Sequence, residues 1–113
     1  MIKKIKLNGK TKWLLLGLLS VAVNIQAEVL VILPESGPMA RAGLSIKQGI
    51  LSAYQASQTN IPLKFVNSDQ KTINAILKKN VSQKTQMIIG PLARAEVEAL
   101  IQANPKIPVL ALN

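Results

Sequence analysis

Six residues in two short segments are the best candidates for binding a ligand or a partner, because each segment directly follows an apolar run. They are Ser36 and Gly37, which follow residues 28–33, and Pro91, Leu92, Ala93 and Arg94, which follow residues 87–89. In an open parallel sheet, the loops at the carboxyl ends of the strands face the crevice in which ligands bind. We therefore place the candidate ligand- or partner-binding site at these two loops.

Ser36 and Arg94 are the polar members of this set, and each has two interpretations. The Ser36 hydroxyl could donate a hydrogen bond to a small ligand, although a serine before a glycine is also common in simple turns. The Arg94 guanidinium could hold a carboxylate or an acidic group of a partner protein. Alternatively, Arg94 pairs with Glu98 one helical turn later, an interaction worth only about 0.2–0.5 kcal/mol.

The other polar residues argue against catalysis. The chain contains no histidine and no cysteine, so it lacks the commonest metal ligand and general base, and it has no thiol for a disulfide or a thioether-linked lipid. Its five acids show no paired arrangement. We expect Asp69 to cap a helix, and Glu96 and Glu98 to interact with a helix dipole. The glycine spacing matches no nucleotide-binding motif. We predict no catalytic residue, no metal, no cofactor and no enzyme activity.

The basic residues are concentrated at the start of the chain, which has a formal net charge of +9. Five of the fourteen lie before an apolar run at residues 13–23, which is shorter than the ~20 residues of a membrane-spanning helix. We interpret residues 1–27 as a secretory signal peptide cleaved after Ala27, with an uncleaved membrane anchor as the alternative. The exported remainder, residues 28–113, has too few aromatic residues and too little clustered charge for nucleic-acid binding.

Alternating apolar runs and helical patterns predict an α/β fold in the order β-α-β-α-β-α-β. The strands are expected at residues 28–33, 63–66, 87–89 and 107–113, and the helices around residues 40–55, 70–81 and 93–103. The run at residues 28–33 is apolar throughout, as in a central parallel strand that is buried on both faces. Right-handed crossovers turn this order into a partial doubly wound parallel sheet with helices on both faces.

Three segments carry a resemblance to known families. Residues 31–43 (VILPESGPMARAG) resemble the opening of a type I periplasmic binding-protein domain. Residues 88–100 (IIGPLARAEVEAL) and 108–113 (PVLALN) are similar, at the right separation, to the LppC/LpoA family of penicillin-binding-protein activators. Residues 66–81 fit the same register. The resemblance implies that residues 28–113 form an incomplete first lobe of such a domain, which belongs to a longer protein in this family.

The resemblance also implies a function. This family comprises bacterial envelope proteins that stimulate peptidoglycan synthases by direct contact, so a bifunctional penicillin-binding protein is the expected partner and the periplasm the expected location. The chain lacks the cysteine to which the family's lipoproteins attach their lipid. The alternatives are a solute-binding component of an amino-acid ABC transporter, with a small amino-acid-like ligand, and a truncated fragment without independent function.

Overall fold

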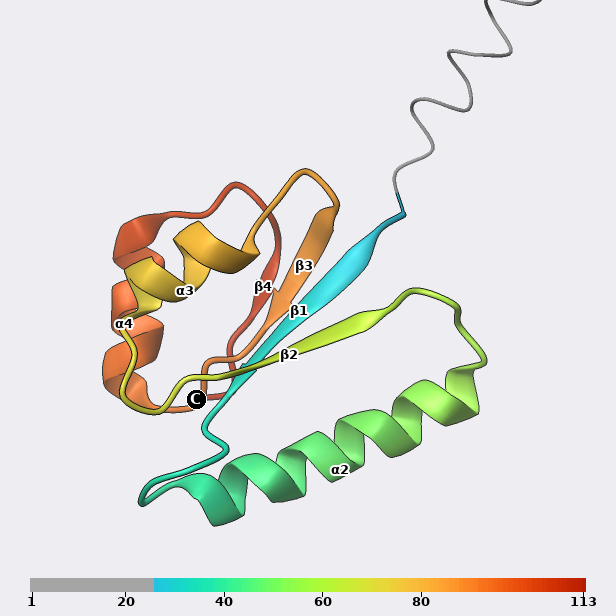
Figure 1. Cartoon of the computed structure of the whole chain (residues 1–113), viewed down its shortest axis with the longest axis horizontal. Coiled ribbons are helices and arrows are strands. Elements are labelled where there is room, and N and C mark those ends of the chain that lie inside the picture. The colour runs from blue at the N-terminus through green and yellow to red at the C-terminus, as the bar shows by residue number, and fades with distance from the viewer. Residues whose placement is uncertain (1–25) are drawn as a thin grey trace, which may run out of the picture.

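The computed structural model describes residues 26–113, and the predicted signal peptide therefore lies almost entirely outside the described residues (Figure 1). The described part is built from alternating strands and helices. In chain order these are β1 (Glu28–Leu33), α2 (Ala40–Ser57), β2 (Leu63–Asn67), α3 (Ile73–Asn80), β3 (Thr85–Ile89), α4 (Arg94–Ala103) and β4 (Val109–Leu110). This order confirms the predicted α/β class.

The four strands form one parallel sheet in the order β2-β1-β3-β4. β1 is central, as its uninterrupted apolar run predicts: residues Leu30 to Leu33 are completely buried. Its register places Val31 beside Phe65 of β2 and beside Ile89 of β3. Because the chain leaves β1 toward β2 and later returns to β3 on the other side, the strand order reverses at β1.

The helices cover the two faces of the sheet unequally. α3 and α4 pack against each other on one face, and α2 lies on the other (Figure 1). The core forms beneath α3 and α4, where apolar residues of the sheet meet one side of each helix. Its buried members are Leu30, Ile32, Ile73, Ile76, Ile88 and Leu100.

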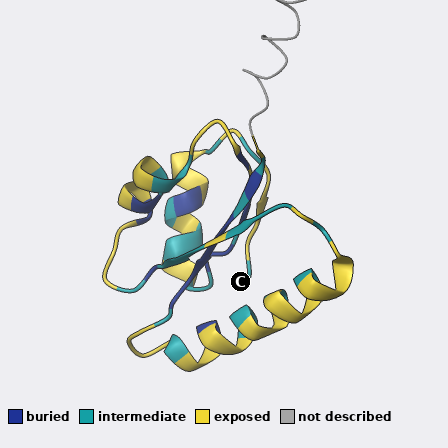
Figure 2. Ribbon diagram, turned by 45° about the vertical axis from the view of Figure 1, so that its right-hand side comes forward, coloured by how far each residue is buried: buried dark blue, intermediate teal, exposed yellow. Residues whose placement is uncertain are grey.

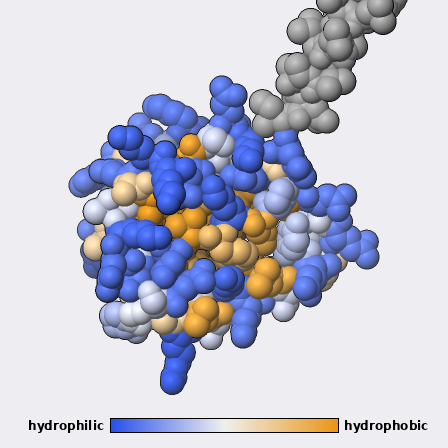
Figure 3. All heavy atoms as spheres, in the orientation of Figure 1, coloured by the Kyte–Doolittle hydropathy of each residue, from blue (hydrophilic) through white to orange (hydrophobic). Residues whose placement is uncertain are grey.

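α2 is a peripheral helix despite its 18 residues. Gly43 is its only buried residue, and Leu44 and Leu51 are largely exposed. Figure 2 shows this contrast, with β1 mostly dark blue and α2 mostly yellow. In the space-filling view, apolar side chains gather at the centre of the visible face (Figure 3). α2 therefore leaves part of the apolar surface of the sheet uncovered.

Two local predictions are wrong in detail. The expected cap, Asp69, is not used, since α3 begins later and Thr72 is its N-cap, with its hydroxyl accepting a hydrogen bond from the Ala75 N–H at 3.1 Å. The last strand is also shorter than predicted, because β4 comprises only Val109 and Leu110 rather than residues 107–113. Pro108 lacks the N–H group that would extend the ladder toward the N-terminus.

Candidate functional site

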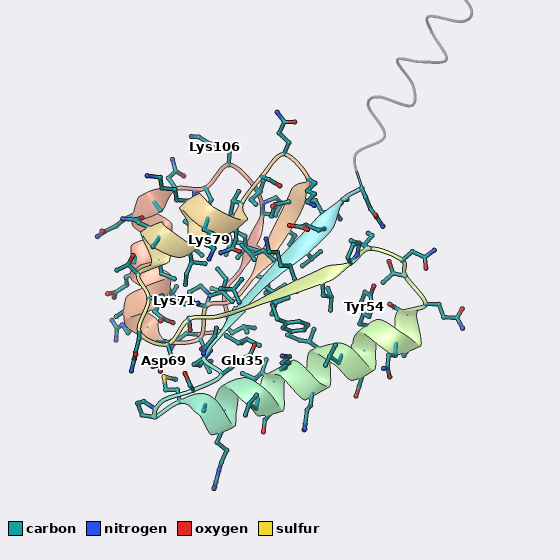
Figure 4. All side chains as sticks on the ribbon, viewed as in Figure 1. Glu35, Tyr54, Asp69, Lys71, Lys79 and Lys106 are labelled. Atoms are coloured by element: carbon teal, nitrogen blue, oxygen red, sulfur yellow. The ribbon has the colours of Figure 1, made fainter. Side chains whose placement is uncertain are left out.

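The two predicted loops lie on either side of the point where the strand order reverses. The Ser36 loop follows β1, and the loop from Gly90 to Ala93 follows β3, which is hydrogen-bonded to β1. In doubly wound sheets this reversal opens a crevice at the carboxyl ends of the strands. The structure adds a third segment, residues 68–72 after β2, which reaches the same end of the sheet (Figure 4).

A network of side-chain hydrogen bonds joins the loop after β1 to the loop after β2. The Ser36 hydroxyl donates to Oδ2 of Asp69 at 2.9 Å and accepts from Nδ2 of Asn67 at 2.9 Å. Oδ1 of Asn67 accepts from the backbone N–H groups of Glu35 and Asp69, at 2.8 and 3.0 Å. The Ser36 proton is therefore already donated within the protein, and Asp69 is an acceptor in this network rather than the predicted helix cap.

Gly37 is required by the geometry of this network. Its φ angle is +76°, in the region that side chains disfavour, and a Cβ atom would overlap the carboxylate of Asp69. The glycine lets the loop after β1 approach Asp69 closely enough for the Ser36 hydrogen bond. Gly37 therefore shapes this loop through its backbone.

A pocket of about 350 Å³ opens among these loops and the start of α4. Two of the six predicted residues, Ser36 and Ala93, line it, and the other four do not. The polar lining residues that the sequence reasoning did not assign to a site are Ser68, Asp69, Gln70, Lys71, Thr72 and Glu96. Their hydroxyl and carboxylate oxygens suit a hydrogen-bond donor, and Lys71 adds a positive charge.

Ser68 and Glu96 are the most unusual polar groups of the pocket. The Ser68 side chain is only 1% exposed, and its Oγ and Oε1 of Glu96 have no partner with full hydrogen-bond geometry within the described part of the chain. Burial raises the pKa of the Glu96 carboxyl above its ordinary value, while polar contacts with Ser68 and the Ala93 backbone act in the opposite direction. The negative charge of Asp69 raises this pKa further.

The remaining predicted residues have structural roles in the turn from β3 into α4. Gly90 has a φ angle of +99°, and a Cβ atom there would overlap the carbonyl oxygen of Ile32. Pro91 follows through a cis peptide bond and is fully buried. The carbonyl oxygen of Leu92 accepts a hydrogen bond from Nδ2 of Asn113 at 3.1 Å. This turn is therefore fixed by close backbone approach on one side and by the end of the chain on the other.

Arg94 points away from the pocket. Its Nε lies 3.3 Å from Oε2 of Glu98, and the two side chains are 84% and 61% exposed. The pairing at i+4 that the sequence suggested is confirmed. An exposed pair of this kind contributes little to stability, since water screens both charges.

Nothing in the sequence alone could bring Ser68, Asp69 and Glu96 together, because they come from segments that meet only through strand pairing. The cluster of polar residues directly after β2 was the available signal. Among residues 26–113, no group of three or more acids could hold a metal ion. No helix in that range combines the length and the apolar character needed to cross a membrane.

Comparison with known proteins assigns the family. The family model described as "LppC putative lipoprotein" matches residues 12–113. Penicillin-binding protein activator LpoA of Photobacterium profundum is 29% identical over 100 residues, covering 85% of this chain and 16% of the relative. LpoA of Haemophilus ducreyi is 34% identical over 87 residues, covering 75% and 15%. The chain thus spans about a sixth of the length of these curated relatives.

Solved structures show the same fold. Full-length LpoA from Haemophilus influenzae superposes with a TM-score of 0.66 at 24% identity, over 80% of this chain and 18% of that one. The C-domain of the same protein, described as a regulator of PBP1A, gives 0.67 at 24% identity, over 77% and 28%. Together with the family match over nearly the whole sequence, these similarities establish that the chain belongs to the LppC family.

Proposed function

We propose that this chain forms part of an envelope protein that activates peptidoglycan synthases through protein-protein contact, without catalysing a reaction itself. The observation that carries the proposal is the family match over residues 12–113, since both curated relatives bear the name penicillin-binding protein activator. The expected partner is a bifunctional penicillin-binding protein in the periplasm. The proposal includes export through the signal peptide at residues 1–27 and a lobe formed by residues 28–113.

The geometry of the loops is consistent with a non-catalytic role. Activation of a serine or threonine nucleophile needs a base within hydrogen-bond reach. At the pocket, the Ser36 hydroxyl donates a hydrogen bond to Asp69, but it also accepts one from Asn67. These two bonds hold the loop after β1 against the loop after β2. The two remaining oxygens of note, on Ser68 and Glu96, are buried from solvent.

The amino-acid transport alternative has weaker support. It relied on Ser36 as the remaining free hydroxyl of the crevice, and that hydroxyl is engaged on both its donor and its acceptor side. The loop after β3 supplies apolar side chains and an outward-pointing Arg94. Within the described loops, no group is better suited to binding the charged groups of an amino acid than to contacting a protein.

A pull-down combined with an activity assay tests the proposal. The full chain, tagged and exported in its native host, is expected to retain a bifunctional penicillin-binding protein and to raise the rate at which the purified enzyme makes cross-linked peptidoglycan. The Gly90→Val variant, in which a branched side chain overlaps the Ile32 carbonyl, serves as the misfolded control and should do neither.

The opposite results are equally clear. Failure of the correctly folded chain to retain or stimulate any synthase would overturn the proposal. Saturable binding of an amino acid in calorimetry, without retention of a synthase, would assign the chain to solute transport instead.

A further inference from the structure

Among residues 26–113, the outer edge of β2 pairs with no other strand. β2 is hydrogen-bonded to β1 on one side only: the Val29 N–H donates to the Pro62 carbonyl and the Ser68 N–H donates to the Leu33 carbonyl, each at 3.0 Å. Successive residues of a strand point their backbone groups to opposite sides. The backbone groups of the intervening odd-numbered residues therefore point outward. These residues are Leu63, Phe65 and Asn67.

A groove runs beside this edge, between β2 and α3. Its volume is about 380 Å³. Val66, Ala75 and Ile76 supply its apolar lining, and lysines stand at its borders. An added strand placed along β2 could direct alternate side chains into this groove, as strands do when they extend a sheet.

The groove carries positive charge that the protein itself does not neutralise. The three ion pairs of the described residues involve Lys47, Lys84 and Arg94. Within residues 26–113, Lys71 and Lys79, which line the groove, have no carboxylate within 4.0 Å. Figure 4 shows them on the α3 side of the molecule, one before α3 and one near its end.

From these observations we propose that the β2 edge is the docking site for an extended, acidic segment of a partner protein, which pairs with β2 as a fifth strand. The unpaired N–H and C=O groups supply the affinity, and the lysines select acidic side chains. A second copy of this chain is disfavoured, because the exposed Lys64 on the edge would repel positively charged strands. A nucleic acid is disfavoured, because the ring of Phe65, the aromatic residue of β2, already lies under Lys47 of α2, with its centre 4.6 Å from Nζ.

The inference does not depend on the identity of the synthase or on the pocket at Glu96. It concerns the opposite side of β1 from β3 and rests on the edge of β2, although Lys71 lines both the groove and the pocket at Glu96. The two proposals can fail separately, because slower exchange in residues 63–67 reports on the β2 edge and retention of a synthase does not.

Peptide binding to the full chain tests the docking site. A labelled peptide of alternating Glu and Val is expected to bind about tenfold more tightly in fluorescence anisotropy than a peptide of alternating Lys and Val, because like charges across an interface are unfavourable. Hydrogen-deuterium exchange should slow specifically in residues 63–67 when the acidic peptide binds. Added salt should weaken binding, since the lysines are exposed.

The structure offers a closely matched pair of variants. Lys71→Glu with Lys79→Glu reverses the charge of the groove, whereas Lys78→Glu with Lys106→Glu makes the same change in net charge at a different hollow, beside Val81 and Ile107. Each double variant alters one lysine in the last turn of α3, so helix effects are balanced. The first should weaken peptide binding about tenfold and the second less than about twofold.

Three results would overturn the docking site. The first is equal weakening by both double variants, which would indicate general attraction between opposite charges. The second is peptide binding without slower exchange in residues 63–67. The third is binding of phosphatidylglycerol vesicles that the groove variant abolishes while peptide binding persists, which would assign the lysines to a membrane surface. Circular dichroism of each variant ensures that the comparison is made between folded proteins.

Discussion

The charged residues near the pocket differ sharply in how much their environment constrains them. Arg94 is exposed and pairs only with Glu98, which is also exposed, whereas Glu96, two positions later, is half-buried against Ser68. Both residues belong to the first turn of α4. Their contrast arises because residues two positions apart in a helix point in directions about 200° apart, so Glu96 faces the loops and Arg94 faces water.

Replacing Arg94 should have a small effect on stability. We expect Arg94→Ala to change the free energy of unfolding by less than ~0.5 kcal/mol, as for an exposed i,i+4 ion pair. Urea unfolding of this variant, of Glu98→Ala and of the double variant measures the coupling between the two side chains. A loss of several times this size would show that Arg94 is held by contacts other than Glu98.

Glu96 should make stability depend on pH. Because its pKa is raised in the folded state, the folded protein binds this proton more tightly than the unfolded chain does, and the associated stability is present at low pH and lost as pH rises through the folded pKa. Glu96→Gln removes this titration. Its free energy of unfolding, relative to the original protein, should therefore increase as the pH is raised above about 4.5.

Urea unfolding of Glu96→Gln and of the original protein at several pH values makes the measurement. Glu98→Gln, at an exposed position of the same helix, serves as a control for the substitution itself. A Glu96→Gln difference that stays constant with pH would contradict the assignment of a raised pKa to Glu96.

At the level of single elements, Gly90 tests the turn from β3 into α4, and Gly49 is the comparison. An added Cβ would be crowded at Gly90 and unobstructed at Gly49. Gly90→Ala should lower the free energy of unfolding by about 2 kcal/mol or more, because the residue has a positive φ angle and a Cβ atom would overlap the Ile32 carbonyl. Gly49 lies in α2 with no atom within 4 Å of the position of a Cβ. Gly49→Ala should therefore raise stability by about 0.5–1 kcal/mol.

Urea unfolding of both variants gives the two free energies directly. Similar effects of the two substitutions would mean that the turn tolerates a side chain and that Gly90 has no special role. The comparison is informative because both changes add the same methyl group and differ only in the backbone angle and the space available.

Most of the elements could be predicted from the sequence, because their signals are local. The apolar run that forms β1, the glycine-proline stop at residues 90–91 and the helical spacing in α4 each depend on adjacent residues. The prediction of Asp69 as the cap of α3 was wrong because its carboxylate accepts a hydrogen bond from Ser36 in the loop network instead. Local preference did not distinguish Asp69 from Thr72.

The pocket could be predicted only as a location. Fold logic placed it at the carboxyl ends of β1 and β3, but its polar groups come from the loop after β2 and from α4. Their proximity depends on the register of β1 with both neighbours and on the packing of α4 against the sheet. Such long-range geometry leaves no periodic pattern in the sequence. The sequence therefore predicted only an interaction with the helix dipole for Glu96.

For the molecule as a whole, the unequal coverage of the sheet is the main feature. Two helices and the buried core lie on one face, and the other face has α2, which buries only Gly43. The matched region covers only 16% and 15% of the two family relatives, so apolar surface exposed here is a natural place for contacts with further protein. The charged groove at β2 belongs to a different part of the surface, beside α3.

The central position of β1 also determines the order in which the protein can fold. Among the strands of residues 26–113, β1 is synthesised first, but one of its two partners, β3, is complete only at Ile89. At typical elongation rates of about 5–20 residues per second, this most apolar strand waits roughly 3–10 s without its second neighbour. Contacts between distant segments also close slowly. The nascent chain therefore passes through a period in which this apolar, aggregation-prone segment is exposed. Chaperones that bind extended apolar peptides should recognise residues 28–33 during that interval.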